Sequence, residues 1–326
     1  MRKTRKPRRI LLWIGFFLLV LSGSLFAQEF PTKPINLIIP SAPGQIGDVT
    51  TRMLATKAEK FLGQPFVFTN NNVGGGAVAL GMVAKAKPDG YTIGSTATGI
   101  LIWRPFVLQV NYKLEDFASI MHCMAMESGL VVKTDSPWKT LKELVAYAKG
   151  NPGKVSYAIT SAGVPMDLAM RYVAKEEGLR WTAVPTPGAD PNNLLLGGHV
   201  SAYSGSTSWV PHVKSGAFRL LAVHSAKRMK DFPNVPTFRE LGYDFVHESE
   251  SLMIAPAGTP EPVVKKLDDA FQKAMEEKDF VDLMNKFGNK ITYRNHEELR
   301  KYLFESRESI GRIIKNLEIA PEPEKR

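Results

Sequence analysis

Short apolar runs and amphipathic stretches alternate along most of this chain. The run Ile-Asn-Leu-Ile-Ile between Pro34 and Pro40 predicts a strand, and apolar residues recur at helical spacing over residues 48–62. The alternation continues with predicted strands at 65–69, 91–95, 130–133, 155–160, 181–185, 200–204, 218–224 and 252–255, and predicted helices at 77–86, 141–150, 166–177, 193–196, 210–215, 263–287 and 297–317. Strands that alternate with helices indicate a parallel sheet, so the expected fold class is α/β.

Two glycine-rich loops follow the first two predicted strands. Residues 44–47 lead into the helix at 48–62, with Asp48 as its expected N-cap, and residues 74–76 lead into the helix at 77–86. Ligands sit at this end of the strands in open α/β sheets. A helix start also offers unpaired N–H groups and the positive end of the helix dipole. The loops therefore predict an anion site made of backbone, and the alternative is that the glycines only form tight turns.

Length and composition favour an ordinary globular protein with two domains. The chain has 326 residues, about twice a typical domain, with 44% apolar and 23% charged residues. These values argue against disorder, a fibrous repeat and a polytopic membrane protein. The net charge is +10, but six basic residues lie within residues 1–27, and the rest of the chain carries +4. Nucleic-acid binding therefore has little support.

The N-terminus has the layout of a secretory signal peptide. A basic segment, Arg2–Arg9, precedes an apolar run from Ile10 to Leu21 and several small residues. We expect residues 1–27 to be this signal, with cleavage before Gln28 or Leu25 and a periplasmic location for the mature chain. The alternative is an uncleaved signal anchor, although the apolar run is short for a membrane span of about 20 residues.

The sequence lacks the patterns of catalytic and metal sites. Cys123 is the single cysteine, which excludes an intramolecular disulfide and a multi-cysteine metal site. The six histidines are scattered without H-E-x-x-H spacing, and no G-x-S-x-G elbow is present. We expect His247, Glu248 and Glu250 to form a solvated segment rather than an acid–base site. The prediction is therefore no enzyme, no metal and no cofactor.

Seven short segments match, in order, the motifs of one protein family. They are PTKPINLIIPSAPGQIGD (31–48), FLGQPFVFTNNNVGGG (61–76), KPDGYT (87–92), LLLGGHV (194–200), PHVKSGAFRLLAV (211–223), NVPTFRELG (234–242) and APAGTP (255–260). Together they resemble the extracytoplasmic solute receptors of tripartite tricarboxylate transporters, the TctC or Bug family. Each motif is weak alone, but seven in register cover the whole mature chain.

The resemblance implies a fold and a function. The fold would be a two-domain α/β periplasmic binding protein of type II, the Venus flytrap. Residues 28–126 would belong to domain I, residues 127–227 to domain II, and residues 228–326 would return to domain I with the C-terminal helices. A small carboxylate would bind in the cleft, held by backbone N–H groups of the two first-domain loops and by bridging water. The receptor, expected as a monomer, would deliver it to integral membrane transporter subunits.

Candidate ligand-binding residues come from both domains. They are Ser41, Pro43, Gly44, Gln45, Gly47, Asp48, Gly74, Gly75, Gly76, Thr96, Thr160, Ser161, Ala162, Gly163 and Trp209. For Trp209 and for Trp103, core packing is the alternative to lining a cleft. The cleft loops depart from the family pattern at Gln45-Ile46-Gly47, at Asn72-Val73 and at Val164 and Asp167, which suggests an atypical ligand or lost binding. Two other functions stay open, namely a binding module that feeds a sensor and an exported α/β enzyme of unknown chemistry.

Overall fold

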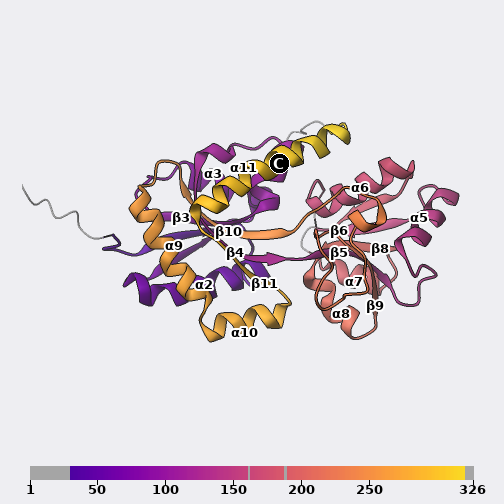
Figure 1. Ribbon diagram of the computed structural model, residues 1–326, viewed down its shortest axis with the longest axis horizontal. Coiled ribbons are helices and arrows are strands. Elements are labelled where there is room, and N and C mark those ends of the chain that lie inside the picture. The colour runs from indigo at the N-terminus through magenta and orange to yellow at the C-terminus, as the bar shows by residue number, and fades with distance from the viewer. Residues whose placement is uncertain (1–29, 161, 187–188, 320–326) are drawn as a thin grey trace, which may run out of the picture.

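The computed structural model describes residues 30–160, 162–186 and 189–319, which form two α/β lobes side by side (Figure 1). The predicted signal peptide lies outside the described residues. The first lobe is built on a sheet with the strand order β11-β4-β10-β3-β1-β2. Its strands are β1 (Ile35–Ile39), β2 (Phe66–Asn70), β3 (Thr92–Ala97), β4 (Phe117–Met126), β10 (Ser249–Pro256) and β11 (Lys290–Arg294). Its helices are α2 (Ile46–Leu62), α3 (Ala77–Ala84), α4 (Arg104–Val107), α9 (Glu261–Met275), α10 (Lys278–Phe287) and α11 (His296–Asn316).

The second lobe is built on a smaller sheet with the strand order β7-β6-β8-β5-β9. Its strands are β5 (Ser128–Lys133), β6 (Ser156–Ile159), β7 (Thr182–Pro185), β8 (Ala202–Ser206) and β9 (Phe218–Val223). Its helices are α5 (Leu141–Gly150), α6 (Pro165–Glu177), α7 (Pro191–Leu196) and α8 (Val210–Lys214). Figure 1 shows this lobe as a separate body, with β4 and β10 leading toward it from the first lobe.

Both sheets mix parallel and antiparallel strands. β1 pairs in parallel with β2 and β3, and β6 pairs in parallel with β7 and β8. β10 is antiparallel to β3 and β4, and β5 is antiparallel to β8 and β9. The expected parallel sheet is therefore correct only for β1 to β3 and for β6 to β8. β5 and β10 are the first strands after the chain crosses from one lobe to the other. Each runs opposite to the parallel strands of its sheet.

Two strands were missed by the sequence pattern. β4, with the sequence FASIMHCMAM, is buried over most of its length and shows no strict alternation of polar and apolar residues. It lies between β11 and β10 inside the sheet, where both of its faces are covered. β11 is a short strand at the edge, with mostly exposed side chains. Neither burial on both faces nor an exposed edge gives the period-two signal on which strand prediction depends.

The chain joins the two lobes through its sheets. β4 continues into β5 with Glu127 alone between them, and β9 is followed by a longer return to β10. Part of this return packs on the second lobe, because the N–H of Phe238 donates to the Val223 carbonyl and the Tyr243 hydroxyl donates to Glu177 on α6. The domain boundaries at residues 126 and 227 stay a prediction.

The helices cover the sheets with amphipathic faces. α11 begins at a capping box in which Asn295 and Glu298 each accept the other's N–H, and it buries Leu299, Leu303 and Ile310. Each buried side chain of this size contributes about 1.5–3 kcal/mol by leaving water. The end of this helix reaches α6 of the second lobe, where Lys175 forms an ion pair of 2.9 Å with Glu318. Within the described ranges, we find no helix with the length and apolar character of a membrane span.

Candidate ligand-binding site

A cavity of about 740 Å³ lies between the two lobes. The first lobe contributes residues after β1, at the end of β3, and from β4 and β10. The second lobe contributes residues of β8 and of the segments that follow β6, β7 and β8. Of the residues predicted from the sequence, those that line the cavity are Ser41, Gly44, Gln45, Gly47, Thr96 and Thr160. The volume is within the range of about 300–1,000 Å³ that is usual for small-molecule sites.

The start of α2 lines this cavity. Gly44 has a φ of +82°, Gln45 is extended, and the helix begins at Ile46. Ile46 and Gly47 both line the cavity. Their N–H groups, in the first turn, have no carbonyl partner inside the helix. Ser41 packs so closely against Gly47 that a Cβ added there would lie 2.6 Å from the Ser41 hydroxyl oxygen. A side chain at position 47 would therefore collide with Ser41, and glycine permits this close packing beside the cavity.

Asp48 does not cap α2 as expected. It is the third residue of the helix, Gln45 occupies the N-cap position, and the Asp48 carboxylate reaches back to accept the Gly44 N–H at 2.8 Å. Its other oxygen accepts Arg52 Nε at 2.7 Å and Asn70 Nδ2 at 2.8 Å. Burial alone would raise the pKa of Asp48, but the hydrogen bonds from Asn70, Gly44 and Arg52 together lower it. The Asp48 side chain is thus buried, and its carboxylate accepts hydrogen bonds from neighbouring protein groups. Asp48 does not line the cavity.

The second glycine loop packs against a cation instead of opening to the cavity. Gly74, Gly75 and Gly76 all have positive φ values, and none of them lines the cavity. Arg104 of α4 donates from Nη1 to the Gly74 carbonyl at 2.9 Å, and a Cβ at Gly75 would collide with its guanidinium. A Cβ at Gly76 would lie 2.7 Å from the Pro40 side chain. These glycines serve a tight turn and close packing, the alternative left open by the sequence.

The remaining described residues that were predicted to bind the ligand do not line the cavity. Pro43 is exposed on the first loop, and Ala162 and Gly163 lie near the start of α6 without lining the cavity, while Ser161 lies outside the described residues. Trp209 is fully buried in the core of the second lobe, where its indole N–H donates to the Gly205 carbonyl at 2.9 Å. Trp209 therefore belongs to the core, because no face of its ring reaches the cavity.

The second lobe supplies residues that sequence reasoning missed, most of them polar. Besides Thr160, it lines the cavity with the polar residues Thr186, Asp190, Asn192, Tyr203, Ser206, Ser208 and His212 and with Ala189 and Pro191. Asp190 is the N-cap of α7 and accepts the Asn192 N–H at 2.9 Å, with Pro191 at the first helical position. An Asp-Pro pair just after a predicted strand is a helix-start signal that could have marked this edge of the sheet.

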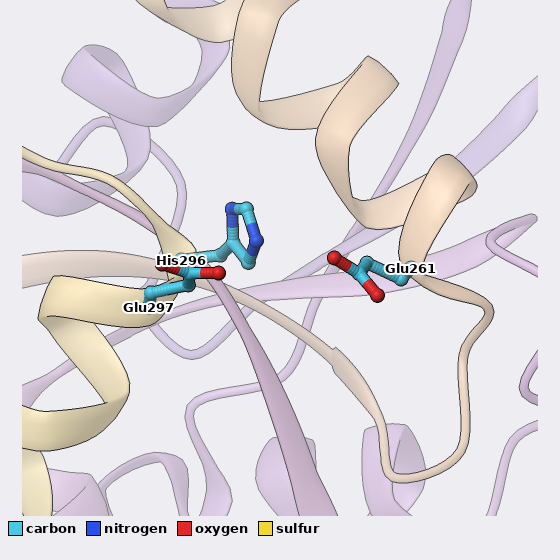
Figure 2. Close-up of side chains that lie close together, drawn as sticks. All are labelled: Glu261, His296 and Glu297. Atoms are coloured by element: carbon cyan, nitrogen blue, oxygen red, sulfur yellow. The ribbon is translucent and has the colours of Figure 1, made fainter.

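A second, smaller cavity of about 440 Å³ lies among polar groups that include His247, Glu250 and Arg294. The segment with His247 and Glu250 is buried, so the expected solvated segment is wrong; burial lowers the pKa of His247 to about 3. Figure 2 shows Glu261, His296 and Glu297, whose ligand atoms lie within 4.8 Å of one another. The two glutamates are exposed, and such acidic groups commonly gather at surfaces without an ion, so this group supports no metal assignment.

The two mixed α/β lobes and the cavity between them define a two-domain periplasmic binding protein. The solved structure of the periplasmic binding protein BugD is similar, with a TM-score of 0.78 and 28% identity over 90% of this chain and 100% of that one. Residues 50–319 match the tripartite tricarboxylate transporter family receptor, TctC, and the chain belongs to this family.

Similar proteins cover nearly the whole chain. A Cupriavidus necator protein described as the UPF0065 protein in the gbd 5' region is 35% identical over 90% of each chain. Protein BugT of Bordetella pertussis is 32% identical over 84% of this chain and 86% of its own. Two structures at 24% identity share the fold. One is an R. palustris protein with adipate (TM-score 0.80, covering 90% and 100%), and the other is MatC of Rhodopseudomonas palustris with bound malate (0.75, 87% and 100%).

These findings confirm the resemblance, the two-domain fold class and the role of a solute receptor in a tricarboxylate transporter family. The family is one of periplasmic receptors rather than enzymes.

Proposed function

We propose that this chain is exported by a signal peptide at residues 1–27, binds a small carboxylate in the cavity, and delivers it as a monomer to the membrane subunits of a tripartite transporter. It would bind the ligand without converting it and without a cofactor or metal. Residues 28–126 and 228–326 would form one domain and residues 127–227 the other, and closure of the two around the ligand would signal the loaded state.

One observation carries this proposal: the first turn of α2, whose N–H groups have no carbonyl partner inside the helix, lines the cavity. Ile46 and Gly47 lie there, and the 17-residue helix adds the positive end of its dipole. Hydrogen bonds to a charged group contribute about 1.5–3 kcal/mol each. Several of them, less the costs of desolvation and closure, would support micromolar affinity, roughly −8 kcal/mol. The relatives solved with adipate and malate make carboxylates the first ligands to test.

The test removes one N–H group while keeping the helix. Ile46 is the first residue of α2, a position where proline is tolerated, and Gln45 before it has a ψ of 157°, which proline also accepts. α6 already has Pro165 at this position after a residue with nearly the same dihedral angles. In Ile46→Pro, the affinity for the best carboxylate found by thermal-shift screening should fall about tenfold, or roughly 1.4 kcal/mol.

The control is Ile46→Val, which shortens the side chain but keeps the N–H group. Its affinity should stay within about twofold of the wild type, and both variants should retain the wild-type circular dichroism spectrum. Equal affinity in Ile46→Pro and Ile46→Val would refute the backbone site. A screen in which carboxylates fail to bind, or one in which the bound compound is recovered altered, would refute the receptor role itself.

A further inference from the structure

The described side chains around the cavity include one carboxylate and no basic group of the lysine or arginine type. Among the described residues that line it, there is no lysine or arginine, one carboxylate, Asp190, and one imidazole, His212. The other polar side chains are hydroxyls and amides. A first carboxylate has the start of α2 as its partner. A second carboxylate would find no lysine or arginine among these residues, and it would meet Asp190, which carries the same charge.

Asp190 presents a carboxylate whose charge is not balanced nearby. Its Oδ1 accepts the N–H and the side-chain amide of Asn192 at 2.9 and 2.8 Å, which makes it the cap of α7. No ion pair joins it to a cation in the described part of the chain, and its side chain is exposed at the cavity. Asp190 is therefore the natural partner for a positive charge that arrives with the ligand.

Asn192 adds an acceptor beside this carboxylate. It is 2% exposed and lines the cavity. Its Nδ2 donates to Asp190 Oδ1 and, at 3.2 Å, to Ser208 Oγ, while its Oδ1 has no hydrogen-bond partner among the described residues. Exchanging the two amide atoms would set the Asn192 oxygen against Asp190, so the orientation is fixed. A buried carbonyl oxygen without a donor is costly, and a donor on the ligand would satisfy it.

We propose that the ligand is a monocarboxylate that carries a protonated amino group. This rests on the proposed function, in which the carboxylate binds at the start of α2. The ammonium group would lie against Asp190 and donate one of its hydrogens to Asn192 Oδ1. An ammonium has three donors and no acceptor, so it matches a carboxylate and an amide oxygen that lie side by side. This specificity differs from that of the related structures solved with adipate and malate.

The test compares ligands of equal length. Purified protein is titrated calorimetrically with ω-amino acids, ω-hydroxy acids and α,ω-diacids of two to six carbons, with glycine as the shortest amino acid. The titrations are done at pH 8.5, above the range in which histidines ordinarily change charge and below that of alkylamines. At the length that binds best, the amino acid should bind at least tenfold tighter than the diacid and tighter than the hydroxy acid. A diacid or hydroxy acid that binds as tightly overturns the inference while leaving the receptor function intact.

A substitution at Asp190 tests whether this residue causes the preference for amino acids over diacids. Asp190→Asn removes the charge and keeps a side chain that caps helices well. It should reduce the ratio of amino-acid to diacid affinity at least tenfold. Asp231→Asn is the matched control, because Asp231 is an exposed aspartate that pairs with Lys214 of α8 and does not line the cavity. An unchanged ratio in Asp190→Asn, or an equal loss in Asp231→Asn, overturns the assignment. Failure of every carboxylate to bind refutes the proposed function instead.

Discussion

The helices α2 and α6 begin in the same way, one in each lobe. Each start has the spacing Gly-x-x-x-Asp-x-x-x-Arg, at residues 44–52 in α2 and 163–171 in α6. In α6, the N–H of Gly163 donates to Asp167 Oδ2 at 2.8 Å, and Arg171 Nε donates to the same oxygen at 2.9 Å. The glycine has a φ of +73°, and the residue after it is extended, as in α2. An aspartate near a helix start is stabilised by the helix dipole. The two lobes therefore share the same hydrogen-bonded arrangement of glycine, aspartate and arginine at a helix start.

The two starts differ in what lies in front of them. In α2, the first helical residue is Ile46, which has an N–H group and lines the cavity. In α6, the first is Pro165, which has no N–H, and a Cβ at Gly163 would lie 2.9 Å from the Val107 side chain of the first lobe. Gly163 and Pro165 do not line the cavity. The same helix-start geometry thus offers an anion site in one lobe and a contact between lobes in the other.

The aspartates also differ in their third partner. Asp48 accepts the amide of Asn70, a partly buried group, whereas Asp167 accepts the Tyr157 hydroxyl at 2.7 Å in a fully buried position. Burial, Asp167 and its hydrogen bond raise the pKa of Tyr157 well above its usual value. The α6 start is therefore tied to the core of its lobe, and the α2 start to a loop. This comparison predicts that the first is mainly structural and the second mainly functional.

The largest effect is expected from Asp167→Ala. The substitution leaves the buried Tyr157 hydroxyl and the Gly163 N–H without their acceptor. A buried donor without a partner costs about 1–3 kcal/mol, so we expect the free energy of unfolding to fall by about 3 kcal/mol. Urea unfolding followed by circular dichroism measures this value.

Arg171→Ala is the control for that loss. The Arg171 side chain is 46% exposed, so its ion pair with Asp167 should contribute about 1 kcal/mol or less. A loss in Asp167→Ala that is no larger than in Arg171→Ala would show that the buried hydrogen bonds do not fix the start of α6.

The sequence predicted where helices and loops occur better than it predicted which loops line the cavity. The helix at 141–150 has the expected bounds because Thr140 caps it and its apolar positions follow helical spacing. The two glycine loops of the first lobe looked equivalent, yet one lines the cavity and the other packs on Arg104, 30 residues away in sequence. Asp190 escaped notice because its place at the cavity depends on where β7 lies in the sheet. Contacts between distant segments decide these roles, and local patterns do not contain them.

An intermediate effect is expected from Gly163→Ala. The new Cβ would be strained at a φ of +73° and would press on Val107 across the contact between the lobes. Strain and overpacking together should lower the free energy of unfolding by about 2 kcal/mol. The lobes should also meet less closely, so ligand affinity should fall about fivefold, as measured by calorimetry.

Removing the Val107 side chain separates these two causes. In the double variant Gly163→Ala with Val107→Ala, the ligand affinity should return to that of Val107→Ala alone, because the steric contact is gone. The backbone strain remains, so stability should recover in part. Affinity that stays low in the double variant would mean that Gly163 acts within its own loop and not across the lobes.

The smallest effect concerns the charge of Asp48 and its dependence on pH. Because the folded protein lowers the pKa of Asp48, the ionised carboxylate stabilises the fold, and this stabilisation is present above the ordinary pKa of 3.8. It is lost as the pH falls through the lowered value, since folded and unfolded chains then bind the proton alike. Asp48→Asn should therefore be less stable than the wild type by about 1 kcal/mol above pH 5, and the difference should shrink below pH 4. Unfolding at pH 3 to 7 measures it, with the exposed Asp135→Asn as a surface control. A difference that grows on acidification would mean that the Arg52 and Asn70 contacts do not hold the charged form.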